Sequence, residues 1–317
     1  MLQRFVKEIY IRHLNRRALL SYAPAGSRPF VPRRQAGYIR GVVGPIELEP
    51  FENVIANDKA TVTWRKLIGR SVDRIILQLG GGNTKANMTL IRVLANEKPI
   101  FDDSGSRTDS RMQYRGLAAA ATFLPLSFIE ERARTVGQLH AGAIDTRASN
   151  IATLTCEATL GAGVAPTLKG FAYVSPSPQS GDPRYNAVIG KVLNKTFNFG
   201  AAGEFPVPLA FSRNPNSFVK RIHFFGATVT DIRYRKTYPD NITDEPFKSA
   251  DALNDFAQGE YQRTPQANIF TVDFCYDGDI GRALPLGDAL SIEWFSTVSG
   301  AGNVTPVSEL LDPLENN

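Results

Sequence analysis

The chain contains few of the residues that build metal sites and disulfide frameworks. Its 317 residues include two cysteines, Cys156 and Cys275, and three histidines that lie far apart. Two thiols cannot form a disulfide framework or a four-thiolate zinc site, and the dispersed histidines form no local ligand motif. The composition therefore disfavours zinc enzymes and small secreted scaffolds. We expect Cys156 and His223 to be packed core residues, and Cys275, which follows a strand-like run, to be partly exposed.

The sequence also lacks a long hydrophobic run. Its longest apolar stretch, residues 116–129 (GLAAAATFLPLSFI), contains Pro125. That stretch is shorter than the roughly 20 apolar residues that a membrane-spanning helix needs. We therefore expect no transmembrane helix, and a membrane contact would be peripheral.

Recognisable catalytic motifs are absent as well. No H-E-x-x-H or G-x-S-x-G sequence occurs, and Gly80-Gly81-Gly82 lacks the rest of a phosphate loop, so we interpret it as a hairpin turn. Asp277 and Asp279, with nearby Asp273, could offer oxygen ligands to calcium, but the twelve-residue calcium-loop pattern is incomplete, which favours a polar turn. We predict no catalytic residue, no enzyme activity and no cofactor, with calcium at Asp277 and Asp279 as the one metal considered.

Positive charge is concentrated at the N-terminus. Residues 1–40 carry nine basic side chains and one acidic side chain, Glu8, for a net charge of +8. The rest of the chain carries 27 basic and 30 acidic side chains, a net charge of −3. This asymmetry is typical of a tail that contacts nucleic acid or an anionic membrane surface.

The first residues predict a basic amphipathic helix. Leu2, Phe5 and Ile9 have the spacing of one helix face, and charged side chains lie on the other side. Three interpretations stay open: the helix lies in a membrane interface, binds nucleic acid, or packs on the body of the protein. The residues assigned to a membrane-facing arm are Leu2, Arg4, Phe5, Val6, Lys7, Ile9, Arg12, Arg16 and Arg17.

The remaining chain contains an ordered internal repeat. The matching segments are Val72–Leu77 with Val219–Phe224, Ile91–Val93 with Ile232–Tyr234, and Gly161–Pro166 with Gly300–Pro306. Arg74 and Arg221 are 147 residues apart, and Pro166 and Pro306 are 140 apart, so the order and nearly the spacing are kept. We therefore predict two copies of one fold, in which Arg74 overlies Arg221 and Pro166 overlies Pro306.

Each copy has the sequence pattern of an all-β fold. Short runs rich in β-branched and aromatic residues alternate with turns rich in Gly and Asp, the pattern of a sandwich or jelly roll. We predict two tandem antiparallel eight-stranded jelly rolls, each with a short helix (residues 110–121 and 249–256), behind the N-terminal amphipathic helical arm. The predicted limits are 1–44 for the arm and linker, 45–180 and 181–311 for the jelly rolls, and 312–317 for a C-terminal tail.

Several stretches of the chain resemble a known family, the double jelly-roll major capsid proteins of corticovirus-type, tailless bacteriophages with an internal membrane. The resemblance runs over roughly residues 50–310. The stretches that carry it are 57–62, Val72–Leu77, 91–96, 166–172, 196–205, Val219–Phe224 and Gly300–Pro306. These motifs are structural rather than catalytic.

The resemblance implies a capsid subunit. It implies three copies in a pseudo-hexagonal block of an icosahedral shell, an N-terminus that faces an internal lipid membrane, and contacts with neighbouring capsomers and with vertex and minor capsid proteins. It implies a protein of the virion, made and assembled in the host cytoplasm, without sequence-specific nucleic-acid binding. Two alternatives remain: a spike-like double sandwich that binds a receptor or carbohydrate, and a jelly-roll hydrolase. Both are disfavoured because the only tryptophans, Trp64 and Trp294, lie in strand-like runs and no catalytic constellation is visible.

Overall fold

A computed structural model describes residues 43–117, 120–133, 135–163, 165–178, 188–211, 214–237, 242–246, 263–287 and 289–315. By its internal contacts the chain divides into two units, Met1–Gly41 and Val42–Asn317, and every described residue belongs to the second unit. The predicted helices of the arm and of residues 249–256 lie outside the described residues. Within the described part, no helix has the length and apolar character needed to cross a membrane.

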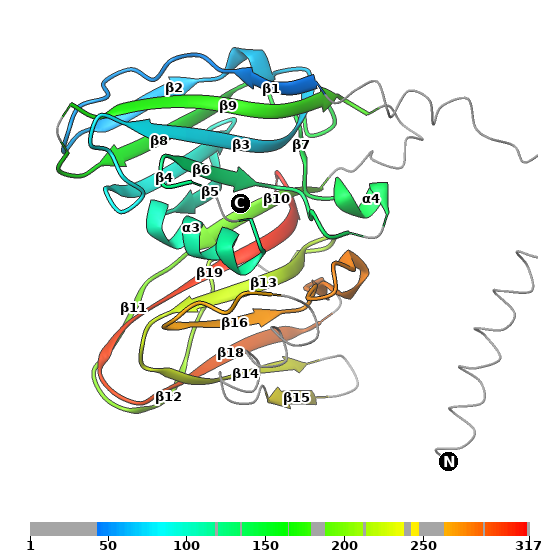
Figure 1. Ribbon diagram of the computed structural model, residues 1–317. Helices are drawn as coiled ribbons and strands as arrows, with labels where there is room; N and C mark the ends of the chain where they lie inside the picture. The colour runs from blue at the N-terminus through cyan, green and yellow to red at the C-terminus, as the bar shows by residue number, and fades with distance from the viewer. Residues whose placement is uncertain are drawn as a thin grey trace, which may run out of the picture. The chain divides into compact units, whose positions relative to one another are not determined.

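The first half of the described chain forms two facing sheets, which we call roll 1 (Figure 1). The outer sheet has the order β1 (Val43–Glu47), β9 (Thr167–Pro176), β3 (Arg70–Gly80), β6 (Phe123–Ser127), and the short β7 (Ile144–Asp145) also pairs with β3. The facing sheet has the order β2 (Lys59–Thr63), β8 (Leu154–Leu160), β4 (Met88–Ala95), β5 (Lys98–Asp103). The chain passes repeatedly from one sheet to the other, as in a jelly roll.

The second half repeats this arrangement and is called roll 2. One of its sheets has the order β10 (Val188–Asn194), β19 (Gly302–Pro313), β13 (Phe218–Phe225), β16 (Ile269–Asp273). The other has the order β12 (Gly203–Pro206), β18 (Ser291–Val298), β14 (Val229–Thr237), β15 (Ile242–Pro246). The short strands β11 (Phe197–Phe199) and β17 (Leu284–Pro285) pair with β19 and β13. Each main strand of roll 1 thus has a counterpart in roll 2, which confirms the two eight-stranded jelly rolls.

The two rolls meet along one sheet edge. Val192 of β10 pairs in parallel with Phe101 of β5, whereas the pairings within each roll are antiparallel among the described strands. Asn194 Nδ2 donates to the Asp102 carbonyl at 2.6 Å and reinforces this edge. The helix α3 (Gly105–Tyr114) lies between the rolls (Figure 1), and the short helices are α4 (Val136–Leu139), η1 (Arg65–Leu67) and η2 (Ile280–Arg282).

Each roll has its own hydrophobic core. Trp64, Ile75 and Leu77 are fully buried in roll 1, and Phe224 and Trp294 are buried in roll 2. Every second side chain of β8 is buried, so one face of the strand supplies the core and the other face stays partly exposed. A fully buried Leu, Ile or Phe contributes about 1.5–3 kcal/mol relative to an exposed one. The core of roll 1 continues into roll 2 through Ile189 and Val307, so the junction is packed rather than loosely linked.

The strand registers confirm most of the predicted repeat. In roll 1, β3 has a bulge between Val72 and Arg74 against β9, and in roll 2, β13 has a bulge between Val219 and Arg221 against β19. Arg74 and Arg221 are therefore the first residues after the same irregularity in corresponding strands. The strands β4 and β14 also carry bulges at corresponding places, just before their Ile-Arg pairs.

The predicted overlay of Pro166 and Pro306 is wrong. With Arg74 on Arg221, the pair Gln78–Lys169 corresponds to the pair Phe225–Thr305, so Pro306 matches Gly170 and lies inside β19. Pro166 lies before β9 begins. The sequence match failed because the connection from β8 to β9 is longer than the connection from β18 to β19.

Two local predictions also need correction. Gly80–Gly82 forms a turn, but it leads from β3 in one sheet to β4 in the other, so it is not a hairpin. Gly81 has a φ of 58°, and a Cβ there would lie 1.8 Å from the Ala165 carbonyl oxygen, which explains the glycine.

The helix predicted at 110–121 begins earlier, because the Ser104 side chain accepts a hydrogen bond from the Arg107 amide at its start. Gly116, with a φ of 76°, follows the end of this helix. The strand β19 ends at Pro313, and the predicted domain limits stay predictions.

Candidate functional site

Charged side chains gather in largely buried positions where roll 1 meets roll 2. We call this group the inter-roll charge cluster. Its basic members are Arg111, Arg115, Lys220, Arg221 and Arg263, and its acidic members are Asp103, Glu130, Glu131, Asp273 and Glu309. The two sets are equal in number, so each charge that leaves water finds an opposite charge nearby.

Arg221 lies at the centre of the cluster and is completely buried. Its Nη2 lies 2.7 Å from Glu130 Oε2, its Nε donates to Asp273 at 2.9 Å, and its Nη1 donates to Glu309 at 3.1 Å. Asp273 lies on β16 and Glu309 on β19, the strands on either side of β13 in roll 2, whereas Glu130 belongs to the segment that follows β6 in roll 1. A single guanidinium therefore holds carboxylates from both rolls.

Helix α3 brings a second arginine to the cluster. Arg111 Nε donates to Asp103 at 3.0 Å, and its Nη1 donates to Glu309 at 2.8 Å. The Glu309 carboxylate is thus shared between Arg111 of roll 1 and Arg221 of roll 2. Hydrogen bonds between ionised groups are shorter and about twice as strong as neutral ones, so this shared carboxylate is a strong and directional link.

A third link connects the end of α3 to β3. The Arg115 Nη2 lies 2.5 Å from Glu131 Oε2, and the Ser127 hydroxyl donates to Glu131 Oε1. Arg74 on β3 donates to the same Oε1 at 3.1 Å. Glu131 therefore ties the helix that covers roll 2 to the outer sheet of roll 1.

The surroundings keep these carboxylates ionised. Burial alone would raise the pKa of Glu130, but the guanidinium groups of Arg221 and Arg115 outweigh it and lower the pKa to about 2. Burial also opposes ionisation of Glu309, yet the guanidinium groups of Arg115 and Arg221 hold its pKa well below the ordinary value. Burial lowers the pKa of His223, which favours the neutral imidazole.

Aromatic contacts complete the covering of roll 2 by α3. The Tyr114 ring lies edge-on to His223 with ring centres 5.4 Å apart, and its hydroxyl donates to Asp273 at 3.4 Å. His223 is buried and its Nδ1 lies 2.9 Å from Thr271 Oγ1, which confirms the expectation of a packed histidine. The cluster can therefore lock the orientation of two folded modules, since its bonds are directional and reach both rolls.

Sequence reasoning missed this cluster. Two strand runs carry charged residues that are buried, Lys220 and Arg221 in VKRIHF and Glu309 in VSELL. That pattern signals a buried polar partner. The partner itself could not be read from the sequence, because Arg111 and Glu309 are 198 residues apart.

The two candidate calcium ligands have protein partners. Asp277 lies 3.2 Å from the Arg282 guanidinium and accepts from the Asp279 amide. Asp279 Oδ1 accepts from the Gly281 amide at 2.9 Å and from Gln138 at 2.7 Å, so it caps η2 and reaches across to roll 1. The described residues contain no group of three or more His, Cys, Asp or Glu side chains placed to hold a metal ion. Calcium at this turn stays a prediction.

The remaining predicted residues divide into two groups. All the arm residues assigned to a membrane, from Leu2 to Arg17, lie outside the described residues. Cys156 is buried as expected, but Cys275 is also buried rather than partly exposed, and burial raises the pKa of its thiol to about 12. Arg221 and Arg263 both donate to the Cys275 carbonyl oxygen. Cys275 therefore lies against the inter-roll charge cluster.

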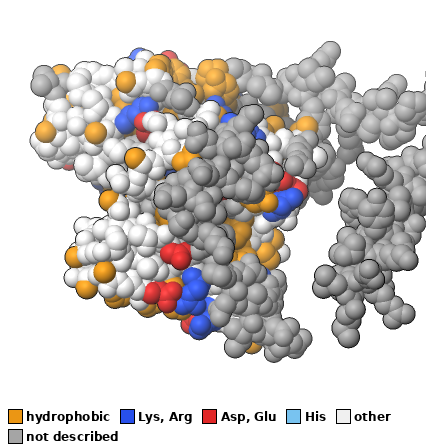
Figure 2. Space-filling view, turned by 60° about the horizontal axis from the view of Figure 1, so that its bottom comes forward, with side chains coloured by type: hydrophobic (Ala, Val, Ile, Leu, Met, Phe, Trp, Pro, Cys, Tyr) orange, Lys and Arg blue, Asp and Glu red, His pale blue; other side chains and the backbone are white. Residues whose placement is uncertain are grey.

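The described surface mixes charges of both signs. On the face in Figure 2, Lys and Arg side chains lie beside Asp and Glu in small groups rather than in a patch of one sign. One such exposed pair in the molecule is Arg233 with Glu204, at 2.9 Å. Exposed pairs of this kind contribute little to stability.

Comparisons with known protein families match both halves of the chain. The model of the viral coat protein P2 N-terminal domain matches residues 45–175, and the model of the viral coat protein P2 C-terminal domain matches residues 189–314. No curated protein sequence matches the chain.

Solved structures with a similar fold come from viruses. The major capsid protein P2 of bacteriophage PM2 is 16% identical, covers 85% of this chain and 97% of its own, and has a TM-score of 0.71. The major capsid protein of Sulfolobus Turreted Icosahedral Virus is 15% identical, with 85% of this chain and 96% of its own covered and a TM-score of 0.60. A PBCV-1 virus capsid model is 10% identical, covers 85% of this chain and 94% of its own, and has a TM-score of 0.53. At these identities the matches establish the double jelly-roll fold.

Proposed function

The chain belongs to the viral coat protein P2 family and is a structural subunit of a virus shell, and from this premise we propose that three copies form the pseudo-hexagonal block of an icosahedral capsid. The family models cover both halves of the chain. The observation that carries the proposal is the pair of equivalent eight-stranded rolls held together by the inter-roll charge cluster. Three chains provide six similar modules around one axis, a closed arrangement with cyclic symmetry.

The arm is proposed to hold the inner face of the shell against an internal lipid membrane. Two sequence features support this: a net charge of +8 over residues 1–40 and the apolar stripe of Leu2, Phe5, Val6 and Ile9. Basic residues near an anionic lipid surface contribute about 1 kcal/mol each. Nucleic acid would attract the same positive charge, but its binding would gain nothing from the apolar stripe.

The remaining partners follow from this role. We expect contacts with neighbouring capsomers and with vertex and minor capsid proteins, and a location in the virion after assembly in the host cytoplasm. We expect no enzyme activity, no obligatory cofactor and no sequence-specific nucleic-acid binding. The alternative of a spike-like receptor- or carbohydrate-binding protein lacks support, because the matching family models are both coat-protein domains.

Sedimentation equilibrium of the purified full-length chain tests the trimer. The expected mass is three times the chain mass of 34.8 kDa. A chain that stays monomeric at micromolar and higher concentrations contradicts the proposal.

Vesicle flotation of the full-length chain tests the arm. Wild-type protein is expected to float with anionic vesicles, and replacing Phe5 and Ile9 by Ser should weaken flotation while leaving DNA retention nearly unchanged. Replacing the exposed Leu290 by Ser serves as the control, since it removes a similar apolar side chain from the body. A wild-type chain that ignores vesicles but binds DNA in a salt-dependent way contradicts the membrane assignment.

A further inference from the structure

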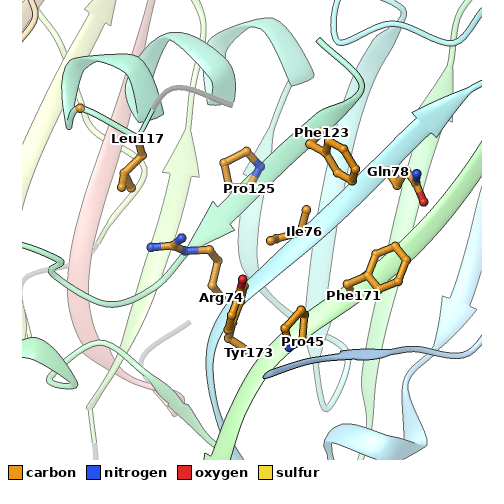
Figure 3. Close-up of a pocket in the computed structure, with 10 residues that line it drawn as sticks. Pro45, Arg74, Ile76, Gln78, Leu117, Phe123, Pro125, Phe171 and Tyr173 are labelled. Carbon is orange, nitrogen blue, oxygen red and sulfur yellow. The ribbon is translucent and has the colours of Figure 1, made fainter. Parts of the chain in front are cut away.

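Two apolar grooves of the described chain differ in where they lie. Figure 3 shows one of about 630 Å³ over the middle of β3, where Ile76, Phe123 and Phe171 contribute to its lining. The other has a volume of about 540 Å³ and lies where several strands of roll 2 begin or end, and we call it the end groove. Its apolar lining comes from Ala141, Val188, Phe218, Ile280, Leu311 and Pro313. Grooves of this size and lining are typical of ligand sites.

The end groove lies at the end of the body where the described chain begins. In roll 1, β1 starts at Val43 opposite Val174, near the end of β9. Strand pairing continues from Val174 through β3 to β7, and Gly142, just before β7, accepts a hydrogen bond from β10. In roll 2, β10 starts at Val188 opposite Pro313, the last residue of β19. We call this end the arm end, because the arm precedes Val43 in the sequence.

The lining of the end groove is apolar, although the described chain leaves it partly open. Val188, Phe218 and Ile280 are only partly buried. The lining comes from the starts of β10 and β13, the end of β19 and the turn η2, and the described residues that form it include no charged side chain. A hydrocarbon chain therefore gains free energy when it leaves water for this groove, whereas a charged group would lose its hydration there.

One polar residue of the end groove has an acceptor atom without a donor. Gln138 contributes to the lining, and its Nε2 donates to Asp279 Oδ1 at 2.7 Å, which fixes the orientation of the amide. Its Oε1 is buried, and no donor of the described chain forms a hydrogen bond with it. A buried acceptor without a donor costs free energy. A ligand that brings an N–H or O–H group to Gln138 is therefore favoured.

The turn that borders the end groove also carries a positive charge. Arg282 belongs to η2, which supplies Ile280 and Gly281 to the lining. Its side chain is 52% exposed; its Nε lies 3.2 Å from Asp277, and its Nη1 donates to the Tyr276 hydroxyl. These contacts use two of its three nitrogens, and guanidinium groups bind phosphate oxygens strongly. An apolar groove with an acceptor in its lining and a guanidinium in the bordering turn matches a phospholipid, which combines a hydrocarbon chain, a phosphate and, in phosphatidylethanolamine, N–H donors.

We propose that the end groove takes one acyl chain of a phospholipid, with the headgroup at Gln138 and Arg282. The proposal rests on the membrane contact proposed above for the arm, and it deepens that function by naming a lipid site on the body of the subunit. The position of the groove at the arm end supports it, because a membrane held by the arm lies near the start of β1. The arm supplies attraction to an anionic surface, and the groove holds a single lipid molecule.

Photolabelling of the full-length protein tests the proposal. The protein is bound to vesicles of phosphatidylglycerol and phosphatidylethanolamine in which some phosphatidylethanolamine carries a diazirine at the end of one acyl chain. Light attaches this chain to the residues around it, and mass spectrometry locates the attachment. Peptides with Phe218, Ile280 or Leu311 should carry at least about tenfold more label than peptides with Ile76 or Phe171 of the groove in Figure 3, because a ligand site encloses most of its ligand.

Matched substitutions show whether the end groove itself holds the chain. Ala141→Phe places a ring in the groove and should lower the labelling of Ile280 and Leu311 at least about fivefold, since the chain loses the space that encloses it. Flotation should persist because the arm is unchanged. Ala201→Phe is the control, since Ala201 is exposed and follows β11 at the opposite end of roll 2, and its labelling should equal that of wild type. Circular dichroism and cooperative unfolding show whether each variant is folded.

A change of headgroup provides a second readout in the wild-type protein if Ala141→Phe does not fold. Phosphatidylcholine replaces phosphatidylethanolamine, the labelled lipid included, while the fraction of anionic lipid stays the same. The new headgroup has no N–H donor for Gln138, so labelling of the end groove should fall at least about threefold.

The outcomes separate the groove from the arm. Wild-type protein that floats but carries equal label in both grooves overturns the lipid site and leaves the membrane contact of the arm standing, as does a folded Ala141→Phe variant labelled as strongly as wild type. Wild-type protein that does not float overturns both. Equal labelling with the two headgroups contradicts the place given to Gln138. If hydroxyl radicals fail to oxidise Phe218 even without vesicles, a protein segment covers the groove, which overturns the lipid site in favour of a protein partner.

Discussion

Glu309 shows how one residue can hold two domains in register. Its two carboxylate oxygens accept from Arg111 of roll 1 and from Arg221 of roll 2, and it is 2% exposed. Such a buried group is retained for the orientation that it imposes rather than for a large net gain in stability. Removing its charge leaves two guanidinium groups buried with fewer partners.

We predict that Glu309→Gln lowers the free energy of unfolding by about 3–5 kcal/mol, the range for breaking a buried ion pair. The matched control is Glu204→Gln, which removes a carboxylate that pairs with Arg233 and is 46% exposed. The control should change stability by less than about 1 kcal/mol. Urea unfolding of both variants measures the difference, and equal effects would contradict the central place given to Glu309.

The lowered pKa of Glu130 makes stability depend on pH in a defined window. The unfolded chain takes up a proton at this carboxylate near its ordinary value of 4.5, whereas the folded chain does so only near 2. The stabilisation is therefore fully present above pH 4.5 and is lost as the pH falls toward 2. Glu309, with its pKa also held low, acts in the same direction.

We predict that the free energy of unfolding falls steeply between pH 5 and pH 2, with a contribution on the order of 3 kcal/mol from Glu130 alone. Glu130→Gln should be less stable than wild type at neutral pH but should show a shallower decline over this window. Urea unfolding at several pH values provides the measurement. If the free energy of unfolding of the variant fell with pH as steeply as that of wild type, the assignment of this pH window to Glu130 would be contradicted.

At the scale of elements, one close approach between the rolls involves glycine backbone. The Gly190 amide on β10 donates to the Gly142 carbonyl at 2.8 Å. A Cβ on Gly190 would lie 2.8 Å from that carbonyl oxygen and 3.0 Å from the Phe128 carbonyl oxygen. The segment after α4 can reach β10 only because residue 190 has no side chain.

We predict that Gly190→Ala destabilises the protein by about 1–3 kcal/mol, since overpacking forces the backbone apart. Gly300→Ala is the control, because a Cβ at Gly300 meets nothing within 4 Å. Thermal unfolding should separate the two variants by several degrees. Equal melting temperatures would show that the approach at Gly190 tolerates a methyl group.

The elements also show how far sequence reasoning reaches. Alternating burial in β4 and β9 and the match of Arg74 with Arg221 follow from local pattern and repeat, so the double jelly roll and the overlay of β3 on β13 were predictable. The Pro166 overlay failed because turn length is free to differ between copies. The inter-roll charge cluster was not predictable, since Glu130, Arg111 and Glu309 meet only after both rolls have folded. The arm lies outside the described residues and its role stays a prediction.

At the scale of the whole molecule, the chain is a pair of similar modules with unequal faces. The β10-β19-β13-β16 sheet of roll 2 is covered by charged groups of roll 1. On the corresponding sheet of roll 1, Ile76, Phe171 and Tyr173 are only partly buried. The contact between the rolls sets the angle between modules within one chain. The trimer proposed above then places six such modules around one axis.

Electron microscopy of the purified full-length protein tests this account most directly. Class averages of single particles should show three chains around one axis, with six densities of similar size in a nearly hexagonal outline. Particles with two densities, the size of one chain, or rings with another number of modules would contradict the account.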